Sequence, residues 1–249
     1  MATEIVCSFA ELDALGEALR LDVRRFPFTI GHHGATREQR VAVVAAAHRD
    51  LAARGLVRGG GFAPELVEAL RLLAGGRTAV ALVGRAGHSR SAALAVTDGR
   101  SGLLAVQRGE SIALLPRRPD AVVRSLVDLL PPARPGPGSS VTVWDSTVTA
   151  RPVEEDFSEF RFTTRLKPAA RSSRAAVEEI LRRPRLAAGY FAATSGGTAL
   201  GALNYLDTDA GRYAVIPGSD RGGLLSATYT PADQAALARH VARLLAAPG

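Results

Sequence analysis

One short segment carries residue types that could perform nucleophilic catalysis. Residues 87–91 read Gly-His-Ser-Arg-Ser, which places a histidine beside a serine between turn-forming residues. A hydrolase nucleophile elbow needs glycine where Ser91 stands and a helix after the serine, whereas the pattern here continues as a strand. The segment therefore favours a hairpin turn. A small-molecule hydrolase that uses His88 and Ser89 stays as the alternative interpretation.

Two other groups of side chains invite a site chemistry. His32 and His33 could bind a metal ion, but adjacent histidines point in different directions and no third ligand follows at a recognisable spacing. A carboxylate cluster could supply the paired acids of the alternative hydrolase, although a solvated charged segment has the same pattern. That cluster consists of Glu154, Glu155, Asp156 and Glu159. We therefore expect that the protein is not an enzyme and that it binds neither a metal ion nor a cofactor.

The elements that surround these residues form a repeat. Each unit is a helix, four apolar strands separated by Gly, Asp and Ser turns, and a second helix that begins at a proline. The strands of the first unit are expected at residues 78–84, 91–97, 103–107 and 112–115. Those of the second are expected at 187–194, 198–206, 212–216 and 224–229. With helices at 64–73 and 174–181, and further helices starting at Pro119 and Pro231, the sequence predicts a duplicated α-ββββ-α unit.

Two capping boxes predict helices ahead of the first unit. Ser8 with Glu11, and Thr36 with Gln39, have the spacing in which each side chain caps the other residue's backbone amide. The first helix should end near Leu19. The second is long, and one face of it carries Val41, Val44, Ala45, His48, Leu51 and Ala52.

A proline-rich segment divides the chain. Residues 131–140 hold four prolines and two glycines, which exclude a helix or a central strand. Residues 1–130 then form an N-terminal half and residues 141–249 a C-terminal half, and we expect both in one compact fold. A short strand at 141–144 should open the second half.

Composition excludes several classes of function. The net charge is +7, but of the 31 basic residues only Lys167 is a lysine, and the arginines form no basic face, so nucleic-acid binding is not expected. Cys7 is the only cysteine, which excludes an internal disulfide. No apolar run reaches the roughly 18 residues of a membrane span, and no basic leader precedes the first strand. A cytoplasmic protein is expected.

The repeated sheet favours a binding module, because it carries small apolar side chains and no convergent chemistry. The second unit holds all four tyrosines of the chain. Tyrosine combines a large apolar area with a polar tip, which suits a binding anchor, although a half-buried sheet edge would use it equally well. The candidate contacts in this unit are Tyr190, Leu203, Tyr205, Tyr213, Leu224 and Tyr229.

The chain also resembles a known family, the EspG proteins, which are chaperones associated with ESX, or type VII, secretion. The resemblance lies in the order and spacing of residues 9–15 (FAELDAL), 51–57 (LAARGLV), 64–66 (PEL), 117–121 (RRPDA), 129–131 (LLP) and 207–213 (DTDAGRY). Together these segments span most of the chain.

The resemblance implies an α/β (α+β) fold in which two pseudo-symmetric halves share a mainly antiparallel sheet flanked by helical bundles. It implies binding to the helical tip of a PPE protein in a PE–PPE pair, or to another helical-hairpin secretion substrate, without cofactor or reaction. The turn at residues 85–90 is shorter than the interface loop of the family, and residues 145–168 do not match its alanine-rich segment. That turn adds Arg85, His88 and Arg90 to the candidate contacts. The particular partner and the oligomeric state stay open.

Overall fold

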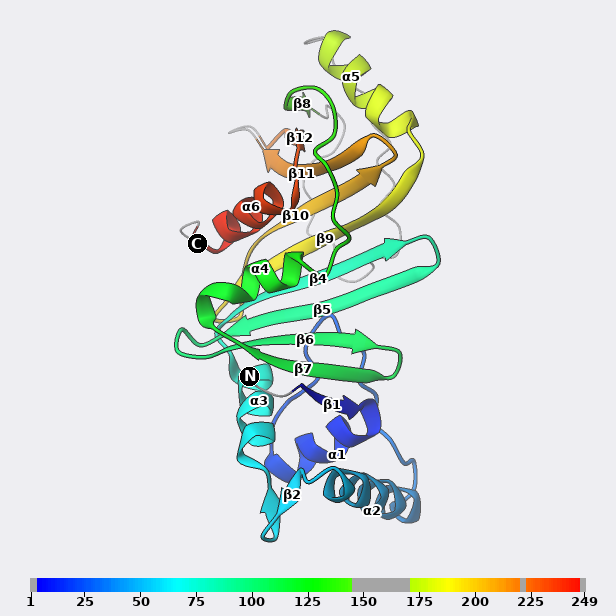
Figure 1. The fold of residues 1–249 in the computed structure, drawn as a ribbon, viewed down its shortest axis with the longest axis vertical. Coiled ribbons are helices and arrows are strands. Elements are labelled where there is room, and N and C mark those ends of the chain that lie inside the picture. The colour runs from blue at the N-terminus through cyan, green and yellow to red at the C-terminus, as the bar shows by residue number, and fades with distance from the viewer. Residues whose placement is uncertain (1–3, 145–170, 220–222, 247–249) are drawn as a thin grey trace.

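The computed structural model describes residues 4–144, 171–219 and 223–246, which form an elongated molecule around one large sheet (Figure 1). The sheet has ten strands in the order β1-β7-β6-β5-β4-β9-β10-β11-β12-β8. Every ladder between neighbouring strands of this sheet is antiparallel. The order has a pseudo-two-fold centre between β4 and β9, as the repeat and the family resemblance together predicted.

The two halves of the chain contribute matching elements. The first half consists of β1 (Ile5–Ser8), α1 (Phe9–Leu19), α2 (Arg37–Ala53), β2 (Val57–Arg58), β3 (Gly61–Phe62), α3 (Pro64–Gly75), β4 (Thr78–Ala86), β5 (Ser89–Thr97), β6 (Gly102–Arg108), β7 (Ser111–Arg117), the 3-10 turn η1 (Pro119–Ala121) and α4 (Val122–Val127). The second half consists of β8 (Val141–Trp144), α5 (Arg171–Arg182), β9 (Arg185–Ser195), β10 (Thr198–Thr208), β11 (Gly211–Ser219), β12 (Leu225–Pro231) and α6 (Gln234–Ala246).

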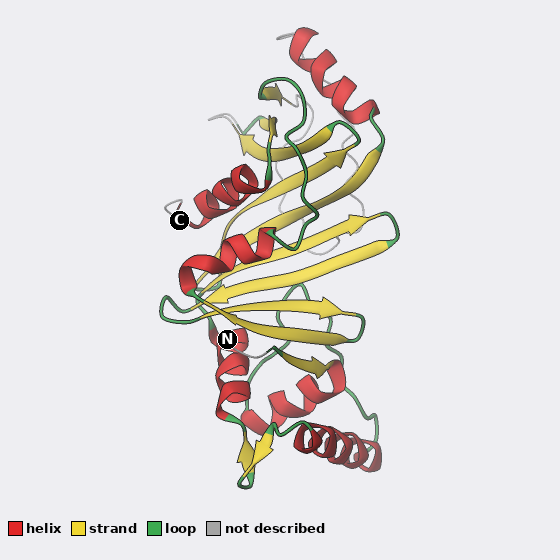
Figure 2. Ribbon diagram, viewed as in Figure 1, coloured by secondary structure: helices red, strands yellow, loops and turns green. Residues whose placement is uncertain are grey.

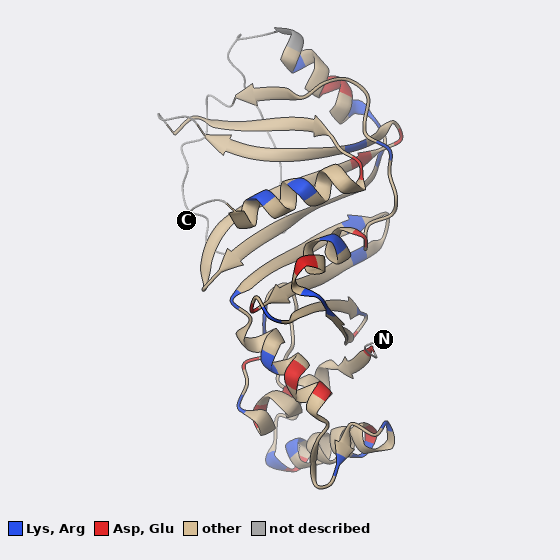
Figure 3. Ribbon diagram, turned by 60° about the vertical axis from the view of Figure 1, so that its left-hand side comes forward, with Lys and Arg blue, Asp and Glu red and all other residues tan. Residues whose placement is uncertain are grey.

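Helices cover the sheet in three places, and each place has its own apolar core (Figure 2). On β4, Ala79 and Ala81 join a cluster with α1 and α3, whereas Val80 and Leu82 join a cluster with α4 and α6. Because alternate strand residues face opposite ways, these two cores lie on opposite faces of the sheet. A third, smaller core packs α5 against β10 to β12. Charged residues lie mainly on helices and turns and seldom interrupt the strands (Figure 3).

Local sequence signals account for most element boundaries. Both capping boxes are present, with the Ser8 hydroxyl accepting from the Glu11 amide and the Thr36 hydroxyl from the Gln39 amide. All eight predicted hairpin strands are confirmed, most of them one to three residues longer than expected. Turn glycines such as Gly87, with a φ of 56°, let the chain reverse between them.

Two expectations about helices were wrong. β12 continues through Pro231, which pairs with Tyr213, so α6 begins at Gln234 rather than at the proline. Asp233 provides the cap instead, since its carboxylate accepts a hydrogen bond from the Ala236 amide at 2.7 Å. In α2 the expected apolar face is buried only at Leu51. Val41 is 63% exposed and Val44 41%, and the helix packs inward through Ala47 and Leu51.

A fully buried arginine joins the two halves. The Arg212 guanidinium on β11 donates to both carboxylate oxygens of Asp207, at 2.6 and 2.8 Å, and to the Pro131 carbonyl at 2.8 Å. It also donates to the Gln234 side chain at 2.6 Å, whose amide in turn donates to the Val127 and Leu130 carbonyls at the end of α4. This one cation therefore fixes β10, β11, α6 and the start of the proline-rich segment.

The seam between the halves is built on a pair of glycines. Gly84 of β4 lies directly opposite Gly189 of β9 in the antiparallel register. A Cβ on Gly189 would lie 2.3 Å from the Val83 carbonyl oxygen and 2.7 Å from the Tyr205 ring, and one on Gly84 would lie 2.2 Å from the Tyr205 hydroxyl. The missing side chains let the Tyr205 ring pack flat across the seam, where it also meets Phe191 with ring centroids 5.9 Å apart.

We expect Arg212→Met to lower the free energy of unfolding by about 3 to 5 kcal/mol, because the Asp207 carboxylate would stay buried without its cation. Chemical denaturation measures the loss. The double variant Arg212→Met with Asp207→Leu should recover part of it, since neither charge is then left alone. A loss no larger than that of the exposed control Arg100→Met would contradict this role.

We expect Gly189→Ala to destabilise the fold by about 1 to 3 kcal/mol, since the added methyl meets backbone that cannot move without opening the seam. Gly75→Ala is the matched control, because a Cβ there has no atom within 4 Å. It should leave stability unchanged or raise it by up to about 1 kcal/mol. Equal thermal melting temperatures for the two variants would show that the seam tolerates a side chain.

Candidate functional site

A groove of about 540 Å³ crosses the seam on the face of the sheet that α5 borders. Its floor follows one row of cross-strand neighbours from β4 to β12. Val83 pairs with Tyr190, which pairs with Asn204, and the row continues through Val215 to Tyr229. A second row, formed by Arg90, Arg85, Ala188 and Leu206, lies beside it. Leu181 of α5 and Arg185 complete the border.

Five of the nine residues predicted to contact a partner line this groove, namely Arg85, Arg90, Tyr190, Tyr205 and Tyr229. Arg85 and Arg90 are exposed on neighbouring strands, and Tyr190 is half-buried on the floor. The other four residues, His88, Leu203, Tyr213 and Leu224, lie elsewhere. His88 is exposed at the tip of the β4–β5 hairpin, and Leu224 is half-buried just before β12.

Burial separates the tyrosines by role. Tyr205, Tyr213 and Tyr229 are 3%, 1% and 5% exposed, and Leu203 is 1% exposed, so these side chains belong to the cores. Tyr213 donates from its hydroxyl to the Pro137 carbonyl at 2.9 Å and anchors the proline-rich segment. Burial raises the pKa of Tyr205 to about 12, an effect that Asp207 strengthens and Arg212 opposes. Of the tyrosines, Tyr190 is therefore the one that offers a surface to a partner.

The alternation of residues along the strands would have identified further residues of the groove floor. Val83, Ala188 and Leu206 alternate with core residues, as Tyr190 does, which identifies them as members of one face. Which strands pair across the seam is not visible in the sequence, because four strands, β5 to β8, and the helices α4 and α5 lie between β4 and β9 along the chain. The groove depends on that pairing.

His88 and Ser89 do not form the nucleophile and base arrangement of a hydrolase. His88 and Ser89 lie on a strand-turn-strand segment rather than a strand-turn-helix, and both are exposed. Among the described residues, no hydrogen bond joins either side chain to a carboxylate that could orient a base. The acidic cluster of Glu154, Glu155, Asp156 and Glu159 lies outside the described residues.

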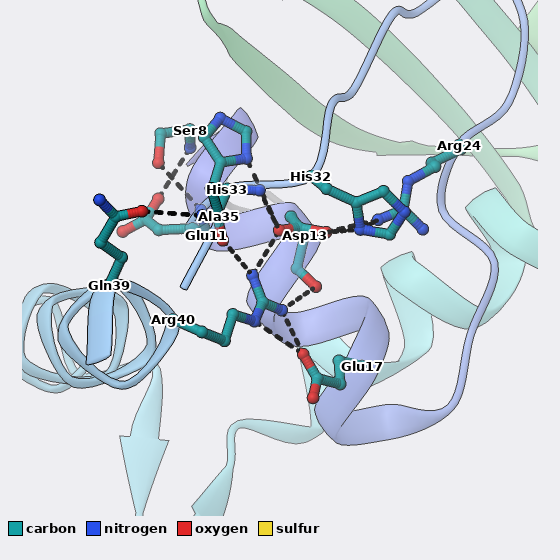
Figure 4. A network of polar contacts seen from close by, with 10 residues as sticks. All are labelled: Ser8, Glu11, Asp13, Glu17, Arg24, His32, His33, Ala35, Gln39 and Arg40. Carbon is teal, nitrogen blue, oxygen red and sulfur yellow. Dashed lines mark hydrogen bonds and ion pairs between the residues drawn. The ribbon is translucent and has the colours of Figure 1, made fainter. Parts of the chain in front are cut away.

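The two histidines lie beside a buried carboxylate, not in a metal site (Figure 4). The Asp13 side chain is 1% exposed and accepts from Arg24 and Arg40, each at 2.5 Å, and from the His33 amide at 2.9 Å. The His32 ring accepts from Arg24 at 3.0 Å. Within the described ranges, no group of three or more His, Cys, Asp or Glu side chains could hold a metal ion.

This Asp13 network fastens three segments of the first half. Arg40 of α2 also pairs with Glu17 and donates to the His33 carbonyl at 3.0 Å, so the loop before α2 is held at both ends. Burial alone would raise the pKa of Asp13, but the His33 amide and the Arg40 and Arg24 guanidiniums outweigh it and hold that pKa below its usual range. The network therefore serves structure.

The fold and the groove define a class, a pseudo-two-fold α/β protein with a largely apolar groove across its sheet and, in the part of the chain described, no assembled catalytic group. The sequence model of the EspG family matches residues 8–243. The chain belongs to the EspG family, as its sequence resemblance indicated.

A solved structure with this fold is that of the Mycobacterium tuberculosis type VII secretion system chaperone EspG5 in complex with a PE25–PPE41 dimer. It is 14% identical to this chain, covers 98% of this chain and 96% of the other, and superposes with a TM-score of 0.62. A search of curated protein sequences gives no match. Among the described helices, none has the length and apolar character to cross a membrane.

We expect Asp13→Asn to lower the free energy of unfolding by about 2 kcal/mol at neutral pH, because both arginines lose their shared counter-charge. Since the folded pKa of Asp13 lies below the unfolded value of about 3.9, its contribution is present above that value and is lost as the pH falls through the folded pKa. Denaturation at pH 7 and pH 3 measures this. The gap between wild type and variant should shrink at pH 3, and a constant gap would refute the assignment.

Proposed function

We propose that this protein is a cytoplasmic chaperone of a type VII secretion system. It binds a PE–PPE-like pair, or another helical-hairpin substrate, and covers the apolar tip of that substrate before export. Membership of the EspG family supports the proposal, together with the EspG5 complex whose fold this chain shares. The observation that carries it is the groove across the seam, because its floor is largely apolar and α5 borders it.

The dimensions of the groove suit a helix tip. Its floor row crosses five strands, from β4 to β12, but Val215 and Tyr229 at its far end are buried in the core beneath α5. The open part runs from β4 to β10, and two inter-strand spacings of about 4.8 Å give a length of ~10 Å. A single helix is about 10 Å across, so the open part accepts the end of a helix, such as one at the tip of a helical hairpin.

The chemistry of the floor suits an apolar ligand. Val83 and Ala188 present aliphatic carbon, Leu206 and Val215 are buried where α5 covers the floor, and Asn204 is the one amide among the described lining residues. A substrate helix that buries its apolar side chains here removes them from water, which favours the complex by roughly 25 cal/mol for each Å² of apolar surface. The same contact keeps those side chains from associating with one another. Binding alone provides the chaperone activity.

Co-expression tests the function directly. The chain should co-purify as a 1:1:1 complex with a PE–PPE pair encoded beside it, or 1:1 with a single helical-hairpin substrate from the same locus. The substrate alone should be less soluble than in the complex. If none of the neighbouring secretion substrates co-purifies, the proposed function is wrong.

We expect Ala188→Trp to weaken the complex by at least about tenfold in Kd, because the indole would fill the middle of the groove and exclude the partner. Ala188 is half-buried on the floor, so the larger side chain can extend into the groove rather than into a core. Ala42→Trp, on the exposed side of α2, is the matched control. Calorimetric titration gives both affinities. A normal Kd for a folded Ala188→Trp variant would show that the partner docks elsewhere.

A further inference from the structure

We infer that the groove selects a partner helix whose apolar face is bordered at one end by acidic side chains, and that Arg85, Arg90 and Arg185 make the selection. This inference rests on the proposed function, since it concerns the partner that occupies the same groove. It adds the chemical character of that partner, which the apolar floor alone does not specify.

The first observation is the charge of the groove. Among the described residues, its lining includes three arginines and no aspartate, glutamate or lysine. Arg85 and Arg90 lie at the hairpin end of β4 and β5, and Arg185 opens β9 two residues before the Ala187 that pairs with Ala86. All three therefore lie toward the same end of the floor, while the middle of the floor is apolar.

The second observation is that these arginines have no counter-ion among the residues that the structure describes. Many arginines elsewhere in the described chain have one, including Arg24, Arg40, Arg54, Arg108 and Arg212. Within the described residues, no ion pair forms on Arg85, Arg90 or Arg185. The Arg85 Nε donates only to the Gly87 carbonyl, at 3.0 Å. The three guanidiniums thus keep nearly all of their donors for a partner.

The third observation is the register of the hairpin. Arg85 lies directly opposite Arg90, so two like charges share one cross-strand position. Such pairs destabilise a sheet, and opposite charges would stabilise it. A carboxylate from a bound helix would relieve the repulsion and accept two-pronged hydrogen bonds from a guanidinium. Carboxylates beyond the apolar face of a helix would meet these arginines when that face lies on the floor.

A polyanion is the competing ligand for three arginines. Nucleic acid would use the charges but not the apolar floor, whereas an acidic-bordered helix uses both. The combination therefore favours the helix. A competition experiment distinguishes the two kinds of ligand. A polyanion would displace a partner that is bound mainly through charge, but not one that is also held by the apolar floor.

The test measures the affinity of the full chain for the PE–PPE pair that co-purifies with it, at 50, 150 and 500 mM NaCl. The wild-type Kd should rise about tenfold over this range, because salt screens exposed charge pairs. The triple variant Arg85→Glu, Arg90→Glu, Arg185→Glu should raise the Kd about 100-fold at 50 mM NaCl, and its Kd should fall as the salt concentration rises, because like charges then face each other. The neutral variant with glutamine at all three positions should fall between.

A matched control carries the same change in net charge away from the groove, through Arg37→Glu, Arg100→Glu and Arg239→Glu, three exposed arginines on α2, on the β5–β6 turn and on α6. Its Kd should stay within twofold of wild type. Lysine substitutions at the acidic residues bordering the partner's apolar face should restore binding to the glutamate variant. Thermal unfolding establishes that each variant is folded.

The outcomes separate the two proposals. If wild type binds and the folded triple variant binds within twofold of it, the charge selection is wrong and the proposed function stands. If a 20-nucleotide single-stranded DNA displaces the pair at 50 mM NaCl, the arginines read polyanions and the inference is overturned. If wild type binds no neighbouring pair, the proposed function fails, and this inference fails with it.

Discussion

The structure depends on a single buried cation, the guanidinium of Arg212. A charge in that position is tolerable only when every donor has an acceptor, so it admits few arrangements of the chain around it. The acceptors come from β10, α6 and the backbone where α4 gives way to the proline-rich segment. By binding these acceptors, Arg212 fixes the position of the segment that connects the first half to the second. Its position above the Tyr205 ring, 5.8 Å from the ring centroid, ties it to the glycine seam.

The seam and the groove are two sides of one arrangement. On one face, the absence of side chains at Gly84 and Gly189 admits the Tyr205 ring, and the helices α4 and α6 cover it. On the other face, alternate residues of the same strands form the groove floor. The close packing at the seam holds together the strands that form the floor, and preorganised surfaces bind with a smaller loss of conformational entropy. The packing of one face therefore supports binding on the other.

Sequence reasoning recovered what local chemistry determines. Capping boxes at Ser8 and Thr36, turn glycines and alternating strands defined the helices and hairpins, and the repeat revealed the duplication. It missed what tertiary contact decides. Val41 and Val44 have helical periodicity, yet Arg40 turns α2 toward Asp13 and leaves them exposed. The tyrosines of β10, β11 and β12 have a strand's alternation, but alternation does not show which face a helix covers. Five of the nine predicted contacts thus line the groove, but the groove itself could not be predicted.

The antiparallel pairing of β4 with β9 has a consequence for the history of the chain. A half-length protein with one four-stranded unit would expose β4 as an open edge, and a second copy turned about a two-fold axis would close it. Joining the copies by residues 131–140 turns a concentration-dependent dimer into a permanent one. Once joined, the copies no longer need to stay alike. One copy has come to carry the hairpin arginines and the other the tyrosines, an asymmetry that a true dimer could never acquire.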